Sequence, residues 1–400
     1  MDDEAEEARA IGLRLQRIRD ARDKSLRPVA ELAGMSRTHL WRIEHGERSA
    51  TLSEIRALAN ALEIAPSELT KLPVPAPANG EAVAVVQAVR LALRAVSDDL
   101  PGGLVLPVEA LRARVTTTVD ALCRCERERE VGAALPGLIR DLHTSLAAGR
   151  DVAQLLDLAV LLHTQVTIPW LRLAGAPLDL SSQPLLLARH AAREHGTAVP
   201  LGLAAAAGAR VMLAEGAFDL ARAGLDAVTV PTTTPGLMQL AGFLALFHSL
   251  VAAADKRVAD ADAALEHASE LAARTGERNA YGLGFGPTNV ALWRMAAALR
   301  FDDHERAATI AEGIRSELPP NRCRQAAYWT DYGRAAARLP GRHEDAVMAL
   351  RRVERISPYR VHRNPIVHDV LAELLPRVRR DSPAGRELRR MAYRAGLPGM

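Results

Sequence analysis

A chain of 400 residues exceeds the size of one compact core, so it predicts several domains, or a small domain followed by a repeat array. A hydrophobic fraction of 48% and a charged fraction of 25% are typical of globular proteins, and a net charge of +3 excludes polyanion binding over the whole surface. Because aromatic residues make up only 4%, Ala, Leu and Val must fill the interior, which favours an all-α fold.

The three cysteines, Cys123, Cys125 and Cys323, are too few and too far apart for a disulfide scaffold, and they are consistent with a reducing compartment. The first seven residues are acidic, unlike a signal peptide, and no 18-residue apolar run is free of charges or helix breakers. We therefore expect a cytoplasmic protein with no membrane partner.

The first 72 residues predict a domain of five short helices around one core. Ser25 and Ser36 stand where they would cap the second and third helices, and Thr51 with Glu54 forms a capping-box pattern before the fourth. A short fifth helix begins at Pro66. The residues expected to face inward are Ile11, Leu15, Ile18, Val29, Ala30, Leu32, Ala33, Leu40, Ile43, Ile55, Leu58, Ala59 and Leu62.

Residues 73–80 form a boundary, because prolines at 73, 75 and 77 exclude helix and favour a semi-rigid extended linker. From 81 to 400 the chain predicts long amphipathic helices separated by Gly, Pro or Asp. The recognisable helix pairs are 198–214 with 217–228, 236–253 with 257–274, 287–300 with 303–317, 322–338 with 342–356, and a terminal pair 364–379 with 383–396. The repeat register of 81–197 stays open.

Small residues follow the turn of each pair, where they allow neighbouring helices to approach closely. They are Ala217, Ala221, Ala261, Ala264, Ala307, Ala308, Ala346 and Ala349. This pattern predicts that residues 81–400 form a tetratricopeptide-like solenoid of helical hairpins, with a sensory or dimerisation role.

Residues 26–48 carry the motif with the clearest function. Its features are Val29-Ala30 before a turn at Gly34, Ser36 as the next cap, and Ile43-Glu44 followed by Gly46-Glu47-Arg48. The segment of about residues 9–72 resembles the xenobiotic-response-element (XRE) family of helix-turn-helix regulators. The resemblance implies a five-helix, lambda-repressor-like DNA-binding fold and a structural ion pair between Arg19 and Glu44.

A recognition helix enters the major groove, where base edges show a full donor and acceptor code. With Leu40 and Ile43 turned inward, the residues predicted to contact bases are Arg37, Thr38, Trp41 and Arg42, and those predicted to contact phosphates are Ser25, Arg27, His45 and Arg48. Residues 9–51 hold ten basic and five acidic side chains, a local charge of +5. A solvated helical surface is the alternative explanation of these arginines.

The sequence predicts no enzyme, metal site or cofactor. Cys123 and Cys125 lack the second pair of ligands that a zinc site needs. The glycines of 282–286 have neither a preceding strand nor the Lys and Ser or Thr of a phosphate-binding loop. We expect this segment to form a turn between helices.

Half of the aromatic residues lie within about fifty positions of two adjacent hairpins, on first helices that would line the concave face of a solenoid. The candidates for a ligand site are Tyr281, Asn289, Trp293, Tyr328, Trp329 and Tyr332. Ordinary packing between hairpins explains the same cluster, so both interpretations stay open at this point.

Together these features predict a sequence-specific DNA-binding transcriptional regulator, resembling regulators abundant in actinobacteria. One helix-turn-helix contacts only a half-site, so we expect a homodimer on a double-stranded operator. A peptide or small-molecule signal would bind the repeat domain. The alternative is a repeat scaffold for a protein partner, to which the small domain merely docks.

Overall fold

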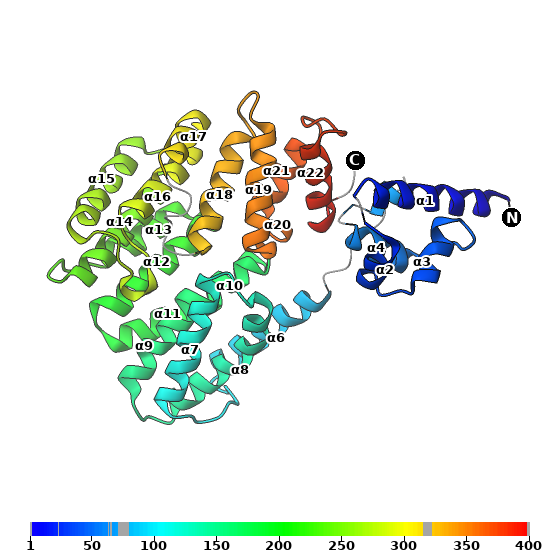
Figure 1. The fold of residues 1–400 in the computed structure, drawn as a ribbon. Coiled ribbons are helices and arrows are strands. Elements are labelled where there is room, and N and C mark those ends of the chain that lie inside the picture. The colour runs from blue at the N-terminus through cyan, green and yellow to red at the C-terminus, as the bar shows by residue number, and fades with distance from the viewer. Residues whose placement is uncertain are drawn as a thin grey trace. The chain divides into compact units, whose positions relative to one another are not determined.

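The computed structural model describes residues 2–22, 24–62, 64, 66–70, 80–314 and 322–397. Within these ranges every regular element is helical, which confirms the all-α class (Figure 1). The described chain forms two compact units. The first holds the N-terminal helices together with the residues from Leu371 onward, and the second runs from α6 (Gly80–Ser97) to Val370. The predicted linker, apart from Gly80, lies outside the described residues.

The first unit contains the five predicted N-terminal helices around one core, in which Leu15 and Leu40 have no exposed surface. A C-terminal helix, α22 (Pro383–Arg394), belongs to the same unit and buries Leu388 and Met391. The N-terminal helices are α1 (Asp2–Asp20), α2 (Leu26–Leu32), α3 (Arg37–Glu44), α4 (Leu52–Ala61) and α5 (Pro66–Thr70).

The predicted caps place α3 and α4. Ser36 Oγ accepts a hydrogen bond from the His39 N–H at 3.2 Å, and the capping box of Thr51 and Glu54 is present at the start of α4. Ser25 is the N-cap of α2, but its side chain makes no capping hydrogen bond. These two caps fix the residues at which α3 and α4 begin.

One inward prediction in this unit is wrong, because Leu32 is 67% exposed. Val29 and Ala30 are buried and Ala33 packs against the same core. Successive helix residues are 100° apart, so Leu32 lies roughly 100° around the helix from the centre of the face formed by Val29, Ala30 and Ala33. A helix of seven residues has only one narrow apolar face, and Leu32 lies outside it.

The second unit begins with helices whose register the sequence left open. They are α6, α7 (Val108–Cys123), α8 (Glu128–Ala147), α9 (Val152–Leu162), a π-helical turn η1 (His163–Thr167), α10 (Ile168–Leu173), a 3-10 turn η2 (Leu178–Ser181) and α11 (Ser182–His195). In this part, α6 and α7 both pack on α8, and α11 packs on α9 and α12.

Four of the predicted helix pairs follow as antiparallel hairpins. They are α12 (Ala198–Ala214) with α13 (Phe218–Asp226), α14 (Pro235–Ala254) with α15 (Val258–Thr275), α16 (Pro287–Arg300) with α17 (His304–Glu312), and α18 (Arg322–Ala336) with α19 (His343–Ile356). A short 3-10 turn, η3 (Ala280–Gly282), precedes α16, and α20 (Pro358–His362) and α21 (Pro365–Leu374) come last. Because α12, α14, α16 and α18 pack successively against one another, the first helices share one face.

Small residues let these hairpins stack closely. A Cβ on Gly242 of α14 would lie 2.2 Å from Cζ of Phe285, which is itself fully buried. Most of the alanines expected near the turns are buried: Ala221, Ala261, Ala307, Ala308, Ala346 and Ala349. Ala217 and Ala264 are half-buried.

Two helical stretches are long and apolar enough to cross a membrane, namely Val152–Leu173 and Pro235–Ala254. The sequence analysis expected no such stretch. Within the protein, 61% and 67% of their apolar windows are buried against neighbouring helices, as in the core helices of a helical domain.

Candidate functional site

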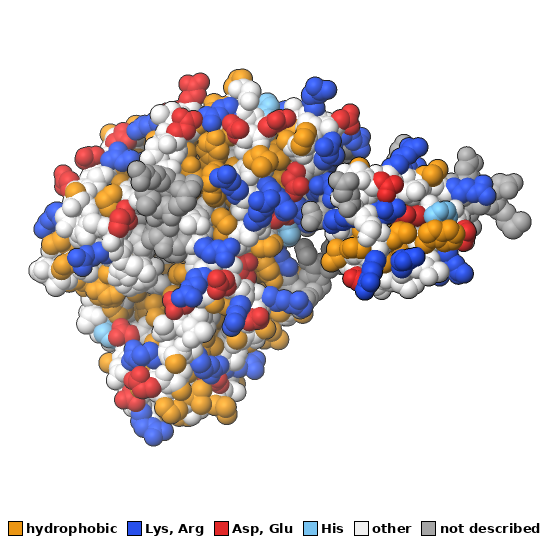
Figure 2. Space-filling view, viewed as in Figure 1, with side chains coloured by type: hydrophobic (Ala, Val, Ile, Leu, Met, Phe, Trp, Pro, Cys, Tyr) orange, Lys and Arg blue, Asp and Glu red, His pale blue; other side chains and the backbone are white. Residues whose placement is uncertain are grey.

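The outer face of α3 carries the residues predicted to read bases. Arg37, Thr38, Trp41 and Arg42 are exposed, whereas Leu40 between them is fully buried. Among the described residues, neither Arg37 nor Arg42 has an ion pair or a side-chain hydrogen bond, so both guanidinium groups are available to a ligand. Figure 2 shows Lys and Arg side chains over the surface of this unit.

Trp41 and His45 form one rigid pair at the end of α3. Their rings stack with centroids 4.0 Å apart, and His45 Nδ1 lies 2.8 Å from the Trp41 carbonyl oxygen. The Trp41 side chain is 39% exposed, so an apolar surface stands between the two arginines. This surface suits contact with a thymine methyl group or with sugar carbons.

The four residues predicted to contact phosphates are also exposed: Ser25, Arg27, His45 and Arg48. Two of them have acidic neighbours, since Arg27 Nε lies 3.0 Å from Glu31 Oε1 and Arg48 Nη2 lies 3.4 Å from Glu54 Oε1. Exposed pairs of this kind contribute about 0–1 kcal/mol, so a phosphate can replace either carboxylate.

The Arg19–Glu44 pair joins the end of α1 to the end of α3. Arg19 donates from Nε to Glu44 Oε1 at 2.7 Å and from Nη2 to Oε2 at 3.0 Å, and it also donates to the Lys24 carbonyl oxygen. The hydrogen bond to Glu44 raises the pKa of Arg19, and the Glu44 side chain is almost fully buried. The pair joins α3 to α1, and it keeps the Glu44 carboxylate away from the exposed face of α3.

Gly12 allows α1 to approach α3 this closely, and the sequence reasoning missed it. A Cβ at this position would lie 2.4 Å from the Ile43 carbonyl oxygen and 2.5 Å from that of Glu44. The available signal was a glycine inside the first predicted helix, where it has a cost relative to alanine.

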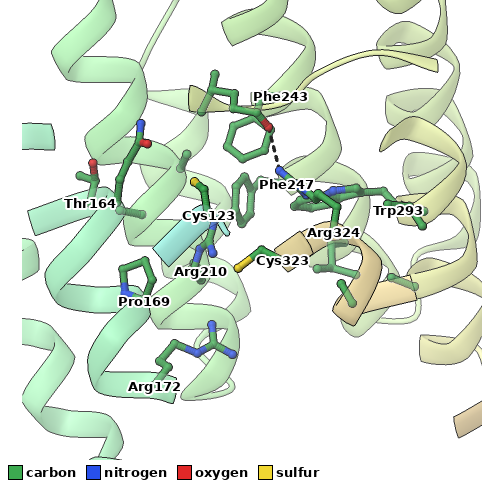
Figure 3. Close-up of a pocket in the computed structure, with 18 of the residues that line it drawn as sticks. Cys123, Thr164, Pro169, Arg172, Arg210, Phe243, Phe247, Trp293, Cys323 and Arg324 are labelled. Atoms are coloured by element: carbon green, nitrogen blue, oxygen red, sulfur yellow. Dashed lines mark hydrogen bonds between the residues drawn. The ribbon is translucent and has the colours of Figure 1, made fainter. Parts of the chain in front are cut away.

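The second unit contains a cavity of about 400 Å³ on the face shared by the first helices (Figure 3). Trp293 and Tyr328 line it, together with Phe243 and Phe247. Trp293 packs edge to face against both phenylalanines, with centroid distances of 5.9 and 4.8 Å. The aromatic cluster therefore forms one wall of a hollow as well as part of the packing.

The other four ligand candidates lie away from the cavity wall. Asn289 has no exposed surface, and within the described part of the chain neither polar atom of its amide has a hydrogen-bond partner. Trp329 and Tyr332 do not line the cavity but pack against Tyr328, which does, and Arg352 lies over the Trp329 ring at 4.1 Å. Tyr281 stands in η3, where its carbonyl oxygen accepts a hydrogen bond from the Gln165 amide.

The sequence reasoning missed the arginines of this cavity. Five line it: Arg172, Arg210, Arg300, Arg324 and Arg360. No local spacing connects them, because they come from five different helices. One signal was nevertheless available, since Arg210 interrupts the otherwise small and apolar sequence of α12.

A cysteine pair lies beside these arginines. The sulfur atoms of Cys125 and Cys323 are 3.3 Å apart, and Arg360 donates a hydrogen bond to Cys323 Sγ at 3.0 Å. The hydrogen bond from Cys125 and the nearby guanidinium groups lower the pKa of Cys323 to about 5, while burial raises that of Cys123 to about 11. These contacts favour the thiolate form of Cys323 more than that of Cys123.

Two histidines form a second buried titratable pair, in α8 and η1. Nε2 of His143 and Nε2 of His163 are 2.9 Å apart, and His163 has no exposed surface. Burial lowers the pKa of His143 to about 4 and holds that of His163 well below its ordinary value. Across the described ranges, no three His, Cys, Asp or Glu side chains are grouped as metal ligands.

Comparison with known proteins identifies the N-terminal segment. Residues 10–72 match the family described as "Helix-turn-helix domain", and no curated protein matches the chain. Among solved structures, PlcR of Bacillus thuringiensis with the peptide PapR7 and DNA is 11% identical, with a TM-score of 0.29 over 76% of this chain and 95% of that one. Apo ComR, the competence regulator of Streptococcus vestibularis, is 12% identical, with a TM-score of 0.30 over 81% and 99%. Neither score is high enough to support an argument, whereas the family match shows that this chain carries a helix-turn-helix domain at its N-terminus.

Proposed function

We propose that this protein is a sequence-specific DNA-binding transcriptional regulator in which α3 enters the major groove. The observation that carries the proposal is the outer face of α3, where Arg37 and Arg42 have no partner among the described residues. Each can form a bidentate pair with guanine O6 and N7, and Trp41 lies between them. The helix-turn-helix match over residues 10–72 supports this placement.

The finer features of the proposal follow from the same geometry. The motif of residues 26–48 and the Arg19–Glu44 pair favour the XRE type of helix-turn-helix. One recognition helix contacts one half-site, so a homodimer is the form that would bind an operator tightly. The second unit, with its cavity, is the part in which a signal would bind, and a cytoplasmic location is consistent with DNA binding.

Selection of binding sequences by the full-length protein from a random DNA pool tests the proposal, followed by affinity measurement on the selected site. Arg37→Ala and Arg42→Ala should each cost about 1–3 kcal/mol and relax the preference at one base position. Arg27→Ala should weaken all sequences alike, because a phosphate contact carries no base information. Arg193→Ala, an exposed change in the second unit, is the matched control.

If both α3 variants keep the sequence preference of the wild type, α3 is not the reading helix. The scaffold alternative would be favoured by a second outcome. In that outcome the protein captures one defined protein partner and shows no salt-sensitive DNA binding. Affinity for DNA falls steeply with salt when counterions are released from phosphates, so the salt series distinguishes the two functions.

A further inference from the structure

The cavity wall of the second unit carries charge of nearly one sign. Its five guanidinium groups face a single lining carboxylate, Asp331, which is already paired with Arg334 at 2.8 Å. The arginines belong to α10, α12, α16, α18 and α20, so the fold brings them together from distant parts of the chain. Figure 3 shows Arg172 and Arg210 on one side of the hollow and Arg324 on the other.

Two of these groups have no carboxylate partner within the described chain. Neither Arg172 nor Arg210 forms an ion pair there, and Arg210 Nε has no hydrogen-bond partner. Burial lowers the pKa of Arg172 and brings that of Arg210 to about 9, and neighbouring arginines add to both shifts. Arg360 differs from them in that it donates a hydrogen bond to Cys323 Sγ. The guanidinium groups of Arg172 and Arg210 both lack a carboxylate partner among the described residues, so an anion in this hollow would gain charge-assisted hydrogen bonds from them.

The guanidinium groups are held in place beside the aromatic wall. Arg210 lies over the Phe247 ring at 5.4 Å and Arg324 over the Phe243 ring at 6.0 Å. Arg324 also donates to the Leu283 carbonyl oxygen at 2.8 Å. A fixed guanidinium binds a carboxylate or phosphate without losing much conformational entropy, and the rings next to it offer an apolar surface.

We propose that this cavity binds a small organic anion, with a carboxylate or phosphate group at Arg172 and Arg210 and an apolar body against Phe243, Phe247 and Trp293. This inference rests on the proposed function, in which the second unit binds a signal, and it names the chemical class of that signal. The volume of about 400 Å³ lies near the lower end for small-molecule sites, so it fits a compact anion better than an extended peptide.

Calorimetric titration of the full-length protein tests the proposal with three probes: octanoate, phenyl phosphate and octanol. We expect at least one anion to bind and octanol to bind at least tenfold more weakly, because a hydrogen bond to a charged group contributes about 1.5–3 kcal/mol. A preference between octanoate and phenyl phosphate tells which head group the arginines select.

Variants locate the site. Arg210→Gln and Arg172→Gln should each weaken anion binding at least tenfold, and the exposed control Arg193→Gln should leave it unchanged. The Arg172 side chain retains substantial accessible surface, so its variant keeps the test decisive if Arg210→Gln fails to fold. Melting temperatures provide a second readout: removing one of several like charges should leave the unliganded protein as stable as before, or more so.

The proposal is overturned if neither anion binds more tightly than octanol, or if both cavity variants bind the anion as the wild type does. DNA affinity measured on the same preparations keeps the two proposals apart. A wild-type protein that binds its operator but neither anion rejects the cavity alone, whereas a wild-type protein that binds an anion but no operator rejects the regulator and retains the cavity.

Discussion

Glu44 has less exposed surface than any other carboxylate described in the first unit. Its ion pair with Arg19 offsets the free-energy cost of burying that charge. Arg19→Met leaves the carboxylate buried without a partner, and we expect a loss of about 3–5 kcal/mol. The double variant Arg19→Met/Glu44→Gln should recover most of it, because the charge is gone. Hydrogen exchange of α3 peptides measures both effects, and unchanged exchange in Arg19→Met would show that the pair does not hold α3.

Cys323 should be the most reactive thiol. The hydrogen bond from Cys125 and the charge of Arg360 lower the pKa of Cys323 and favour its thiolate, whereas burial raises the pKa of Cys123. Iodoacetamide labelling read by mass spectrometry should therefore modify Cys323 first, at a rate that changes little above about pH 6. Cys125→Ala and Arg360→Gln remove a hydrogen bond and a charge, so each should move the rise in rate to higher pH. Faster labelling of Cys123 would contradict the assignment.

At the scale of helices, Gly242 determines how closely α14 packs against Phe285, which precedes α16. Gly242→Ala would place a methyl group on the ring of the fully buried Phe285, and we expect destabilisation of about 1–3 kcal/mol. Gly137→Ala in α8 is the matched control, since nothing lies within 4 Å of its Cβ position. Alanine there should instead stabilise by about 0.5–1 kcal/mol. Thermal unfolding of the two variants gives opposite shifts if the packing is as described.

The His143–His163 pair, in α8 and η1, should make the stability of the fold depend on pH. Both histidines are held neutral in the fold, with pKa values below the ordinary 6.5, so the unfolded chain binds more protons in mild acid. The stability from this pair is complete above about pH 6.5 and is lost as pH falls toward about 4, by an expected 1–3 kcal/mol. His143→Gln should flatten the melting temperature over this window. An unchanged slope would show that other groups cause the acid sensitivity.

Much of the fold was predictable because its signals are local. Caps, breaks and apolar periodicity predicted α3, α4 and the four hairpins, and the resemblance implied the Arg19–Glu44 contact. The cavity was not predictable in the same way. Its arginines lie on five helices, and only tertiary packing brings Arg172 and Arg360 to one hollow. Of the ligand candidates, Trp293 and Tyr328 line the cavity, whereas Asn289 is turned into the core by its helix.

At the scale of the whole molecule, the first unit is discontinuous in sequence. Its N-terminal helices are joined by the residues from Leu371 onward, and Arg390 Nε lies 3.9 Å from Glu68 of α5. The sequence analysis instead placed the last two helices at the end of the solenoid. The first unit therefore includes residues from both ends of the described chain.

Leu388 tests this composition. It is fully buried, so Leu388→Ala should cost about 2–5 kcal/mol. If α22 supports the first unit, hydrogen exchange should become faster in peptides of α2 to α4. Leu265→Ala in α15 is the control, because it should affect the second unit alone. Faster exchange confined to residues 371–397 would show that α22 is an independent element.

The discontinuous first unit also couples the two units through the connectivity of the chain. Roughly 290 residues separate its two segments, and closing a flexible loop of that length has an entropic cost of about 5 kcal/mol. When the second unit is folded, the distance between its first and last residues is fixed, so the two segments of the first unit are no longer joined by a flexible loop. Anything that keeps the second unit folded, a bound anion included, therefore also lowers the entropy lost when the two segments of the first unit meet.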